Sequence, residues 1–267
     1  MLLIVDIGNS NTVLAVYDGE ICLHTWRCVS DRKRTDDEYA VLLQQFLATA
    51  ELRFADLTAA AVSSTVPALV EKWQRLCRKY LKVEPLVAGV DIRTDMKIGV
   101  EFPQQLGPDR LVNAVAGRAK YGCPVIVLDL GTATTFDCVS AEGDFLGGVI
   151  APGVAVAAES LGTSTARLPK VEFVRPKKAL GTNTVQALQS GIVYGFAGLV
   201  DGVVRRLKQE MGGEVKVIAT GGLAAGIAEV AETIDVVDPL LTLDGLRILY
   251  DLNKAENKDM NKDKEEK

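Results

Sequence analysis

Two short stretches of this chain share a pattern of residue types that can bind a phosphate chain. The first reads Asp-Ile-Gly-Asn-Ser-Asn-Thr over residues 6–12, and the second reads Asp-Leu-Gly-Thr-Ala-Thr-Thr over residues 129–135. The glycine lets the backbone approach a phosphate, and the turn amides and the hydroxyl or amide side chains donate hydrogen bonds to it. The carboxylate cannot bind phosphate directly, so its natural partner is a metal ion, directly or through water. Two such loops predict two half-domains that face one nucleotide, and therefore an ATP-dependent phosphotransferase.

The two stretches align without a gap from Asp6 and Asp129 through Thr12 and Thr135. An apolar run precedes each of them, at residues 2–5 and 125–128, and a turn follows each. A single Asp-x-Gly pattern at a strand end is also ordinary turn chemistry. The repetition in register, with Thr or Asn at matching places, is what favours a phosphate site.

The elements that position these loops follow from apolar periodicity and turn residues. We expect strands over residues 2–7, 12–17, 20–27, 59–62, 85–88, 124–130, 133–139, 145–151 and 215–219. Helices are expected over 36–50, 67–80, 108–121, from 152 onward, over 183–211, after 222 and up to about 252, with irregular segments at 89–107 and 162–180.

Each copy of the motif opens a meander of three strands that is followed by helical segments. This order predicts an α/β fold of two related half-domains, each with a mixed sheet flanked by helices. We expect the half-domains to be residues 1–116 and 117–253. Residues 254–267 are dominated by Lys, Asp and Glu, which predicts a charged, disordered tail.

Composition argues against several classes of protein. The formal net charge of −5 and the absence of a basic patch argue against a nucleic-acid partner. We find no uninterrupted apolar run of the roughly 18 residues that a membrane helix needs, and no secretory leader pattern, which together predict a cytoplasmic protein. The five cysteines lack CxxC spacing and there is one histidine, His24, so neither a zinc cluster nor a histidine-dependent triad is expected.

Neither of the two commonest nucleotide-binding fingerprints is present, since the chain has no GxxxxGK[ST] and no GxGxxG sequence. The repeated Asp-x-Gly hairpin and the late Thr220-Gly221-Gly222 turn after a strand instead resemble the actin, hexokinase and Hsp70 superfamily of ATPases, which has a ribonuclease H-like fold. That resemblance implies that the two hairpins hold the phosphates and that the late glycines lie against adenosine.

Four further motifs occur in a fixed order along the chain. They are Gly-Pro-Asp-Arg at 107–110, Gly-Gly-Val-Ile-Ala-Pro-Gly at 147–153, Thr-Val-Gln-Ala-Leu-Gln-Ser-Gly at 184–191, and Asp-Pro-Leu-Leu-Thr-Leu-Asp-Gly-Leu at 238–246. With the two hairpins, this set closely resembles the type III pantothenate kinases over residues 1 to about 250. Two departures stand out, because the family commonly has Gly-Ala-Asp-Arg and often has an aromatic residue where Val100 aligns.

The resemblance implies phosphorylation of pantothenate to 4′-phosphopantothenate with ATP and Mg²⁺, the first step of coenzyme A biosynthesis. It also implies a monovalent cation, K⁺ or NH₄⁺, bound at Asp129, and a homodimer whose substrate site lies at the subunit interface. The implied catalytic base is Asp109. The implied substrate contacts are Val100, Gly107, Pro108, Asp109, Arg110 and Thr184, the last of these from the neighbouring subunit. The implied ATP contacts are Asp6, Ile7, Gly8, Asn9, Ser10, Asn11, Thr12, Val13, Thr132, Gly221 and Gly222.

The residues alone leave simpler interpretations open. Asp109 follows Pro108 at a helix start and would serve there as a helix cap. Arg110 suits a surface ion pair, Asp129 a strand-end turn, and Thr220-Gly221-Gly222 a tight strand-to-helix turn. Two other functions also stay open: a kinase of another small hydroxylated metabolite, and a non-catalytic nucleotide-binding accessory factor.

Overall fold

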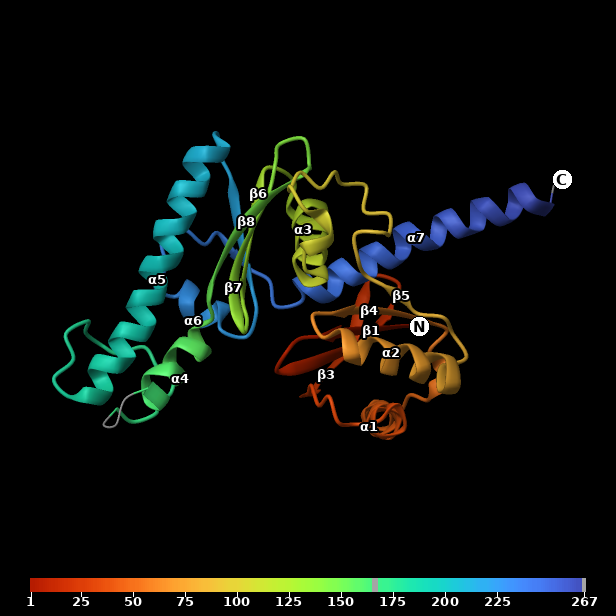
Figure 1. The fold of residues 1–267 in the computed structure, drawn as a ribbon, viewed down its shortest axis with the longest axis horizontal. Helices are drawn as coiled ribbons and strands as arrows, with labels where there is room; N and C mark the ends of the chain where they lie inside the picture. Colours follow the sequence, from red (N-terminus) through yellow and green to blue (C-terminus); the bar gives the residue numbers. More distant parts are fainter. Residues whose placement is uncertain (165–167, 266–267) are drawn as a thin grey trace. The chain divides into compact units, whose positions relative to one another are not determined.

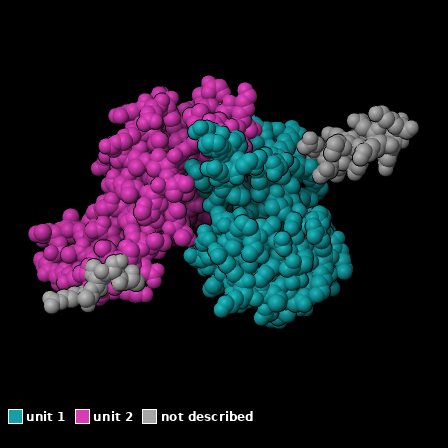
Figure 2. Space-filling view, in the orientation of Figure 1, with its two compact units in different colours: residues 1–95, 101–116, 242–267 teal, residues 96–100, 117–241 magenta. Residues whose placement is uncertain are grey.

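The chain folds into two compact units. The computed structural model describes residues 1–164 and 168–265. One unit comprises residues 1–95, 101–116 and 242–267, and the other comprises residues 96–100 and 117–241 (Figure 2). Each unit has its own sheet and core. The contiguous half-domains expected from the sequence, and the nature of the tail, stay predictions.

A mixed five-stranded sheet forms the centre of the first unit (Figure 1). Its strands lie in the order β3-β2-β1-β4-β5. β1 pairs antiparallel with β2 and parallel with β4, so the central strand joins a hairpin to a crossover. The strand bounds are β1 Leu2–Ile7, β2 Asn11–Asp18, β3 Ile21–Val29, β4 Ala59–Ser64 and β5 Leu86–Val87.

Helices α1 (Asp36–Thr49) and α2 (Pro67–Leu76) cover one face of this sheet. α1 begins at a capping box, in which the Thr35 hydroxyl accepts from the Glu38 amide and the Glu38 carboxylate accepts from the Thr35 amide. α2 ends in a π-helical turn over Cys77–Leu81. The core on this face includes Leu3, Val5, Ile7, Leu43 and Trp73.

Helices α3 (Pro108–Tyr121) and α7 (Leu241–Glu265) complete the framework. Tyr17 is fully buried, and its hydroxyl donates to the Asp244 carboxylate of α7 at 2.7 Å. Since Tyr17 pairs with Leu2, it lies on the sheet face away from Leu3 and Val5. α7 therefore lies over the sheet face that α1 and α2 leave free.

The predicted end of the last helix near residue 252 is wrong, because α7 continues to Glu265. The tail from residue 254 contains neither Pro nor Gly. Nothing in its local sequence therefore stops a helix that has already begun.

The second unit repeats the strand topology of the first. Its sheet order is β10-β9-β6-β7-β8, with β6 antiparallel to β7 and parallel to β9. The strands are β6 Val125–Leu130, β7 Ala133–Val139, β8 Phe145–Pro152, β9 Lys216–Thr220 and β10 Val236–Val237. The expected α/β fold of two related halves, each opened by a three-strand meander, is confirmed.

Three helices cover one face of the second sheet: α4 (Val154–Ser164), α5 (Thr184–Met211) and α6 (Ala224–Ala228) (Figure 1). The sequence prediction missed the two-residue strand β10 and the 3-10 helices Phe54–Asp56 and Pro103–Gln105. Such short elements carry too few residues to show a periodicity. Of the irregular segment expected over 162–180, residues 165–167 lie outside the described residues, and no helix or strand occurs over 168–180.

α5 is the longest apolar helix in the part of the chain that the structure describes. It is long and apolar enough to cross a membrane by length and composition alone, which is weak evidence for a span. Asp201 lies in its middle and accepts hydrogen bonds from the Thr233 amide and hydroxyl, at 3.0 and 2.8 Å. One face of α5 thus packs in the core of this unit. Only 39% of the most apolar 18-residue stretch of the helix is buried, however.

Candidate functional site

The first Asp-x-Gly motif forms the turn between β1 and β2. The Gly8 amide donates to the Asn11 carbonyl at 3.0 Å, which closes the turn. Asn9 and Ser10 at its tip are exposed, and the Asn9 side-chain amide reaches the Thr65 hydroxyl at 3.5 Å. The turn therefore places amide and hydroxyl groups at the surface, and these are the groups that bind anions.

The second motif forms the corresponding turn between β6 and β7, but it is one residue tighter. Ile7 pairs with Thr12 in the first hairpin, whereas Leu130 pairs with Thr134 in the second. The gapless alignment of Thr12 with Thr135 is therefore wrong beyond the glycine. The sequence alone does not reveal this one-residue shift, because threonine occupies both positions 134 and 135.

Thr12 and Thr134 are the structural equivalents, and both are fully buried. The Thr12 and Ser30 hydroxyls are hydrogen-bonded at 2.9 Å, and the Thr134 hydroxyl donates to the Pro152 carbonyl at 3.1 Å. Each threonine thus ties its hairpin to the segment at the end of the third strand of the meander. Thr132, by contrast, is exposed at the tip of the second turn.

Strand alternation places both motif aspartates away from the main helix layers. Leu3, Val5 and Ile7 pack toward α1 and α2, so Asp6 lies on the opposite face. In the second unit, Ile126, Leu128 and Leu130 pack toward α4, α5 and α6, so Asp129 is likewise on the opposite face. Both carboxylates are half-buried at the ends of central strands.

The surroundings of Asp6 suit a Mg²⁺ ion that also binds phosphate. Asp6 is in register with Ser63 of the parallel strand β4, and in-register neighbours share a sheet face. The Ser63 hydroxyl is buried and makes no hydrogen bond to the described residues. In the described part of the chain, no group of three or more His, Cys, Asp or Glu is placed so that it could hold a metal ion by itself. A single carboxylate with oxygen donors nearby fits Mg²⁺, which keeps several waters and takes its other ligands from phosphates.

Asp109 lies in the first turn of α3, after Gly107 and Pro108. Burial raises the pKa of the Asp109 carboxyl above its ordinary value, although the Arg110 and Asp109 amides donate to it and oppose this shift. A Cβ atom on Gly107 would lie 2.5 Å from the Asp109 Oδ1, so the glycine is needed for this carboxylate position. The amide hydrogen bonds fit a helix cap, but the desolvation goes beyond capping and makes the carboxylate a better proton acceptor.

The Thr220-Gly221-Gly222 turn packs directly on the end of β6. Gly221 has a φ of +95°, and a Cβ atom there would lie 2.6 Å from the Asp129 Oδ1 and 2.7 Å from the Leu130 carbonyl carbon. Any side chain would displace the turn from the second hairpin. The turn is therefore tight, as the sequence suggests, and it also brings bare backbone beside the Asp129 carboxylate.

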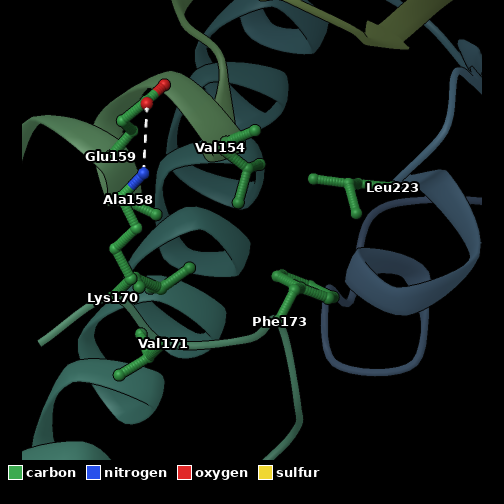
Figure 3. Close-up of a pocket in the computed structure, with 9 residues that line it drawn as sticks. Val154, Ala158, Glu159, Lys170, Val171, Phe173 and Leu223 are labelled. Carbon is green, nitrogen blue, oxygen red and sulfur yellow. Dashed lines mark ion pairs between the residues drawn. The ribbon is translucent and has the colours of Figure 1, made fainter.

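A mostly apolar pocket of about 240 Å³ opens beside this turn. Val154, Phe173 and Leu223 point into it from three different segments (Figure 3). Glu159 and Lys170, which form an ion pair at 3.6 Å, add the charged part of its lining. Sequence reasoning missed this pocket, because its residues come from separate elements and Phe173 lies in an irregular segment.

Both walls of the pocket are connected to the second hairpin by adjacent glycines. Val154 follows Gly153, whose α-carbon lies against the carbonyls of Gly131 and Thr132. Leu223 follows Gly221 and Gly222 on the opposite wall. A ligand with an anionic part at the hairpin can therefore place an apolar part in this pocket.

The remaining sequence-predicted residues are distributed over both units. Gly107, Pro108 and Arg110 are half-buried at the start of α3 in the first unit. Val100 belongs to the second unit, where its side chain lies near Gly147. Thr184 is exposed in the first turn of α5, behind Asn183, which accepts from the Gln186 amide at 2.9 Å.

Comparison with known proteins identifies sequence and structural relatives. The model of the type III pantothenate kinase family matches residues 2–206. A type III pantothenate kinase of Bacillus cytotoxicus is 47% identical over 254 residues, which cover 95% of this chain and 97% of that protein.

Two solved structures share the fold. A Campylobacter jejuni protein described as a Baf family transcriptional activator has a TM-score of 0.59 at 21% identity, over 95% of this chain and 99% of that one. Component A of the (R)-2-hydroxyglutaryl-CoA dehydratase of Acidaminococcus fermentans has a TM-score of 0.53 at 14% identity, over 92% and 94%. This chain thus shares its two-unit α/β fold with these two solved structures.

The raised pKa of Asp109 predicts a pH-dependent change in stability on substitution. Because burial raises the pKa of the Asp109 carboxyl in the folded state, its contribution to the free energy of unfolding is complete below the unfolded pKa of about 3.9. That contribution is lost as the pH rises through the folded pKa. Asp109→Asn removes the buried charge and keeps an oxygen for the amide donors. We expect this variant to be at least as stable as the wild type at pH 7 by urea unfolding.

The difference should vanish as the pH falls below about 4, where the carboxyl is neutral in both states. Asp18→Asn, at the exposed end of β2, is the matched control. An Asp109→Asn protein that is less stable than the wild type at pH 7 would contradict the desolvation described here.

Proposed function

The chain belongs to the type III pantothenate kinase family, and from that membership we propose which of its residues carry out the reaction. The enzyme transfers the γ-phosphoryl group of ATP to pantothenate and forms 4′-phosphopantothenate, the first step of coenzyme A biosynthesis. The observation that carries the proposal is the half-buried Asp109 carboxylate at the start of α3, whose pKa is raised by desolvation.

Asp109 acts as the base in our proposal. The terminal hydroxyl oxygen of pantothenate forms a bond to the γ-phosphorus while the bond from that phosphorus to the β,γ-bridging oxygen breaks, and ADP leaves. The Asp109 carboxylate orients the hydroxyl and accepts its proton. Because phosphoryl transfer has a loose transition state, positioning contributes more than base strength, although the raised pKa helps the carboxylate accept the proton.

The residues around Asp109 bind pantothenate. The Arg110 guanidinium suits the substrate's carboxylate and amide oxygens, and Gly107 and Pro108 shape the approach to Asp109. Val100 and Thr184 supply further contacts to pantothenate, and Thr184 reaches the pantothenate site of the partner subunit.

The turn residues of both hairpins bind ATP phosphate oxygens. In the first unit these are residues 6–13, and in the second Thr132 is the exposed hydroxyl donor. Asp6 and the neighbouring Ser63 hydroxyl would hold Mg²⁺, directly or through water. The ion would neutralise charge on the β- and γ-phosphates.

The pocket of Val154, Phe173 and Leu223 takes the adenine ring, with the ribose against Gly221 and Gly222. Its apolar walls and its volume of about 240 Å³ suit a planar base. Its glycine-linked walls also connect it to the phosphate-binding hairpin.

Asp129 binds a monovalent cation, K⁺ or NH₄⁺, beside the phosphates. Its half-buried carboxylate lies against the bare backbone of Gly221, and a carboxylate oxygen is a ligand that suits a hard cation. The ion would offset negative charge where the triphosphate binds.

The enzyme acts as a cytoplasmic homodimer in our proposal. Apolar side chains of the second unit are exposed on either side of Thr184, since Leu180 is 82% exposed and Val185 is 43% exposed. The incompletely buried α5 adds to this surface. A second copy would bury it, and sedimentation should then give about twice the 28.6 kDa mass of the chain, whereas the single-chain mass would contradict a dimer.

A coupled assay of ADP release tests the chemical proposal. With ATP, Mg²⁺ and K⁺, we expect turnover only when pantothenate is present, and a large loss when Na⁺ replaces K⁺. Asp109→Asn should lower kcat by about 10²-fold or more, because it removes the proton acceptor. Asp18→Asn should have no effect.

Near-native turnover of Asp109→Asn would exclude Asp109 as the base. Turnover that is indifferent to the monovalent ion would leave the kinase activity in place but exclude a cation role for Asp129.

Filling the apolar pocket tests the adenine assignment. Ala158 lines the pocket from α4, and Ala158→Phe would occupy the space that the base needs. We expect the KM for ATP to rise about tenfold or more, a change typical of losing an apolar fit. The KM for pantothenate and inhibition by tripolyphosphate should not change, since neither depends on a base.

Val156→Phe is the matched control, because Val156 lies on the same helix with its side chain 46% exposed and outside the pocket lining. An unchanged KM for ATP in a folded Ala158→Phe enzyme would exclude this pocket as the adenine site.

A further inference from the structure

The motif at residues 238–246 has no role in the reaction as described so far. It connects β10 to α7 and includes the first turn of that helix. Within the first unit, this turn contacts α3, the helix that carries Asp109 and Arg110.

Thr242 bonds to α3 one turn beyond the proposed base. Its hydroxyl donates to the Asn113 Oδ1 at 2.7 Å. Asn113 is 1% exposed and lies four residues after Asp109, which places the two residues on the same side of the helix. A half-buried hydrogen bond at this position restrains the rotation of the first turns of α3.

Gly245 brings the two helices into backbone contact. A Cβ atom there would collide with the Val112 carbonyl oxygen and would lie 2.8 Å from the Val112 Cγ1 and 3.1 Å from the Ala116 Cβ. The backbone oxygen cannot move aside as a flexible side chain could. The separation of α3 from α7 is therefore set by the missing side chain of Gly245.

Asp244 in turn anchors α7 to the sheet. It accepts the hydroxyl of the fully buried Tyr17 at 2.7 Å. Burial, together with the hydrogen bond and charge of Asp244, raises the pKa of Tyr17 far above its ordinary value, so the hydroxyl stays a donor. A continuous path of contacts thus runs from β2 through α7 to the start of α3.

The other end of α3 is held by the same segment within the second unit. The Asp238 carboxylate accepts from Lys120 at 2.6 Å and from the Tyr121 hydroxyl at 2.8 Å. Burial opposes ionisation of Asp238, but these hydrogen bonds outweigh it and lower its pKa below the ordinary value. The carboxylate is therefore ionised at neutral pH and holds the last turn of α3.

We propose that Thr242 and Gly245 are positioning residues for phosphoryl transfer, which set the rotation and height of α3 and thereby place the Asp109 carboxylate. The proposal rests on the proposed role of Asp109 as the base. Neither residue touches the substrate in this account. Their effect on the reaction passes entirely through α3.

Steady-state kinetics of Thr242→Val and Thr242→Ser test the proposal. Valine keeps the shape and removes the hydroxyl, while serine keeps the hydroxyl. We expect Thr242→Val to lower kcat about tenfold. Gly245→Ala should lower kcat by about 10²-fold, because a misplacement of the reacting groups by about 1 Å costs about this factor. The KM for ATP should stay within about twofold of the wild-type value, because neither Thr242 nor Gly245 lies in the hairpin turns. Thr242→Ser should retain most of the wild-type kcat.

The acid limb of the pH profile separates positioning from mere stability. If Thr242→Val lets α3 shift, the Asp109 carboxylate becomes less desolvated and its pKa falls, so the acid limb should move to lower pH. Leu249→Val, in the buried part of the same helix, is the matched control, which should lose stability in urea unfolding but keep the wild-type kcat and acid limb.

A Thr242→Val enzyme with reduced stability but wild-type kcat and pH profile would overturn the proposal. Equal losses of kcat in Thr242→Val and Thr242→Ser would also overturn the proposal, because the Thr242 hydroxyl would then make no difference to turnover. The comparison with Asp109→Asn keeps the two hypotheses apart. If Asp109→Asn abolishes turnover while Thr242→Val does not change it, the positioning role fails and the base assignment stands.

Discussion

The end of the central strand in each sheet is the constraint on which the rest of the structure depends. β1 and β6 each pair with an antiparallel hairpin strand on one side and a parallel strand on the other. A parallel neighbour requires a crossover, and the crossover helices cover one face of the sheet. Strand alternation then puts Asp6 and Asp129 on the opposite face, at the point where the chain turns. A carboxylate, an exposed turn and a nearby parallel strand end thus arise together from one topology.

Close backbone approach is the second requirement, and it explains two glycines in particular. Gly221 lets the turn after β9 rest on Asp129 and Leu130. Gly245 lets α7 rest on the carbonyl of Val112. The first brings bare backbone beside the Asp129 carboxylate in the second unit, and the second sets the height of the helix that carries Asp109. In both places a methyl group would move an element that has to be placed within a fraction of an ångström.

The sequence predicted most of the regular elements, because long periodic runs and turn residues determine them locally. The meanders opened by residues 2–7 and 124–130 are examples, and so is α3 behind Pro108. The register of the second hairpin was not predictable, since adjacent threonines at 134 and 135 satisfy either pairing. The end of α7 was not predictable from polarity, because a polar segment without Pro or Gly can continue a helix that has already begun.

The candidate site was predictable only where its residues form linear motifs. The Asp-x-Gly turns and the Gly-Pro-Asp-Arg sequence are of this kind. The pocket of Val154, Phe173 and Leu223 draws its residues from distant parts of the chain, and the bond between Thr242 and Asn113 joins residues far apart in sequence. Contacts of this type follow from the packing of helices and sheets, and a single sequence carries no local signal for them.

The central claim is that the Asp109 carboxylate meets the hydroxyl that is phosphorylated. A crystal structure with pantothenate and a non-hydrolysable ATP analogue tests it most directly. We predict that the terminal hydroxyl oxygen of pantothenate lies about 2.6–3.2 Å from an Asp109 carboxylate oxygen and in line with the γ-phosphorus. A hydroxyl bound beyond hydrogen-bonding reach of Asp109, with another group in its place, would contradict the account.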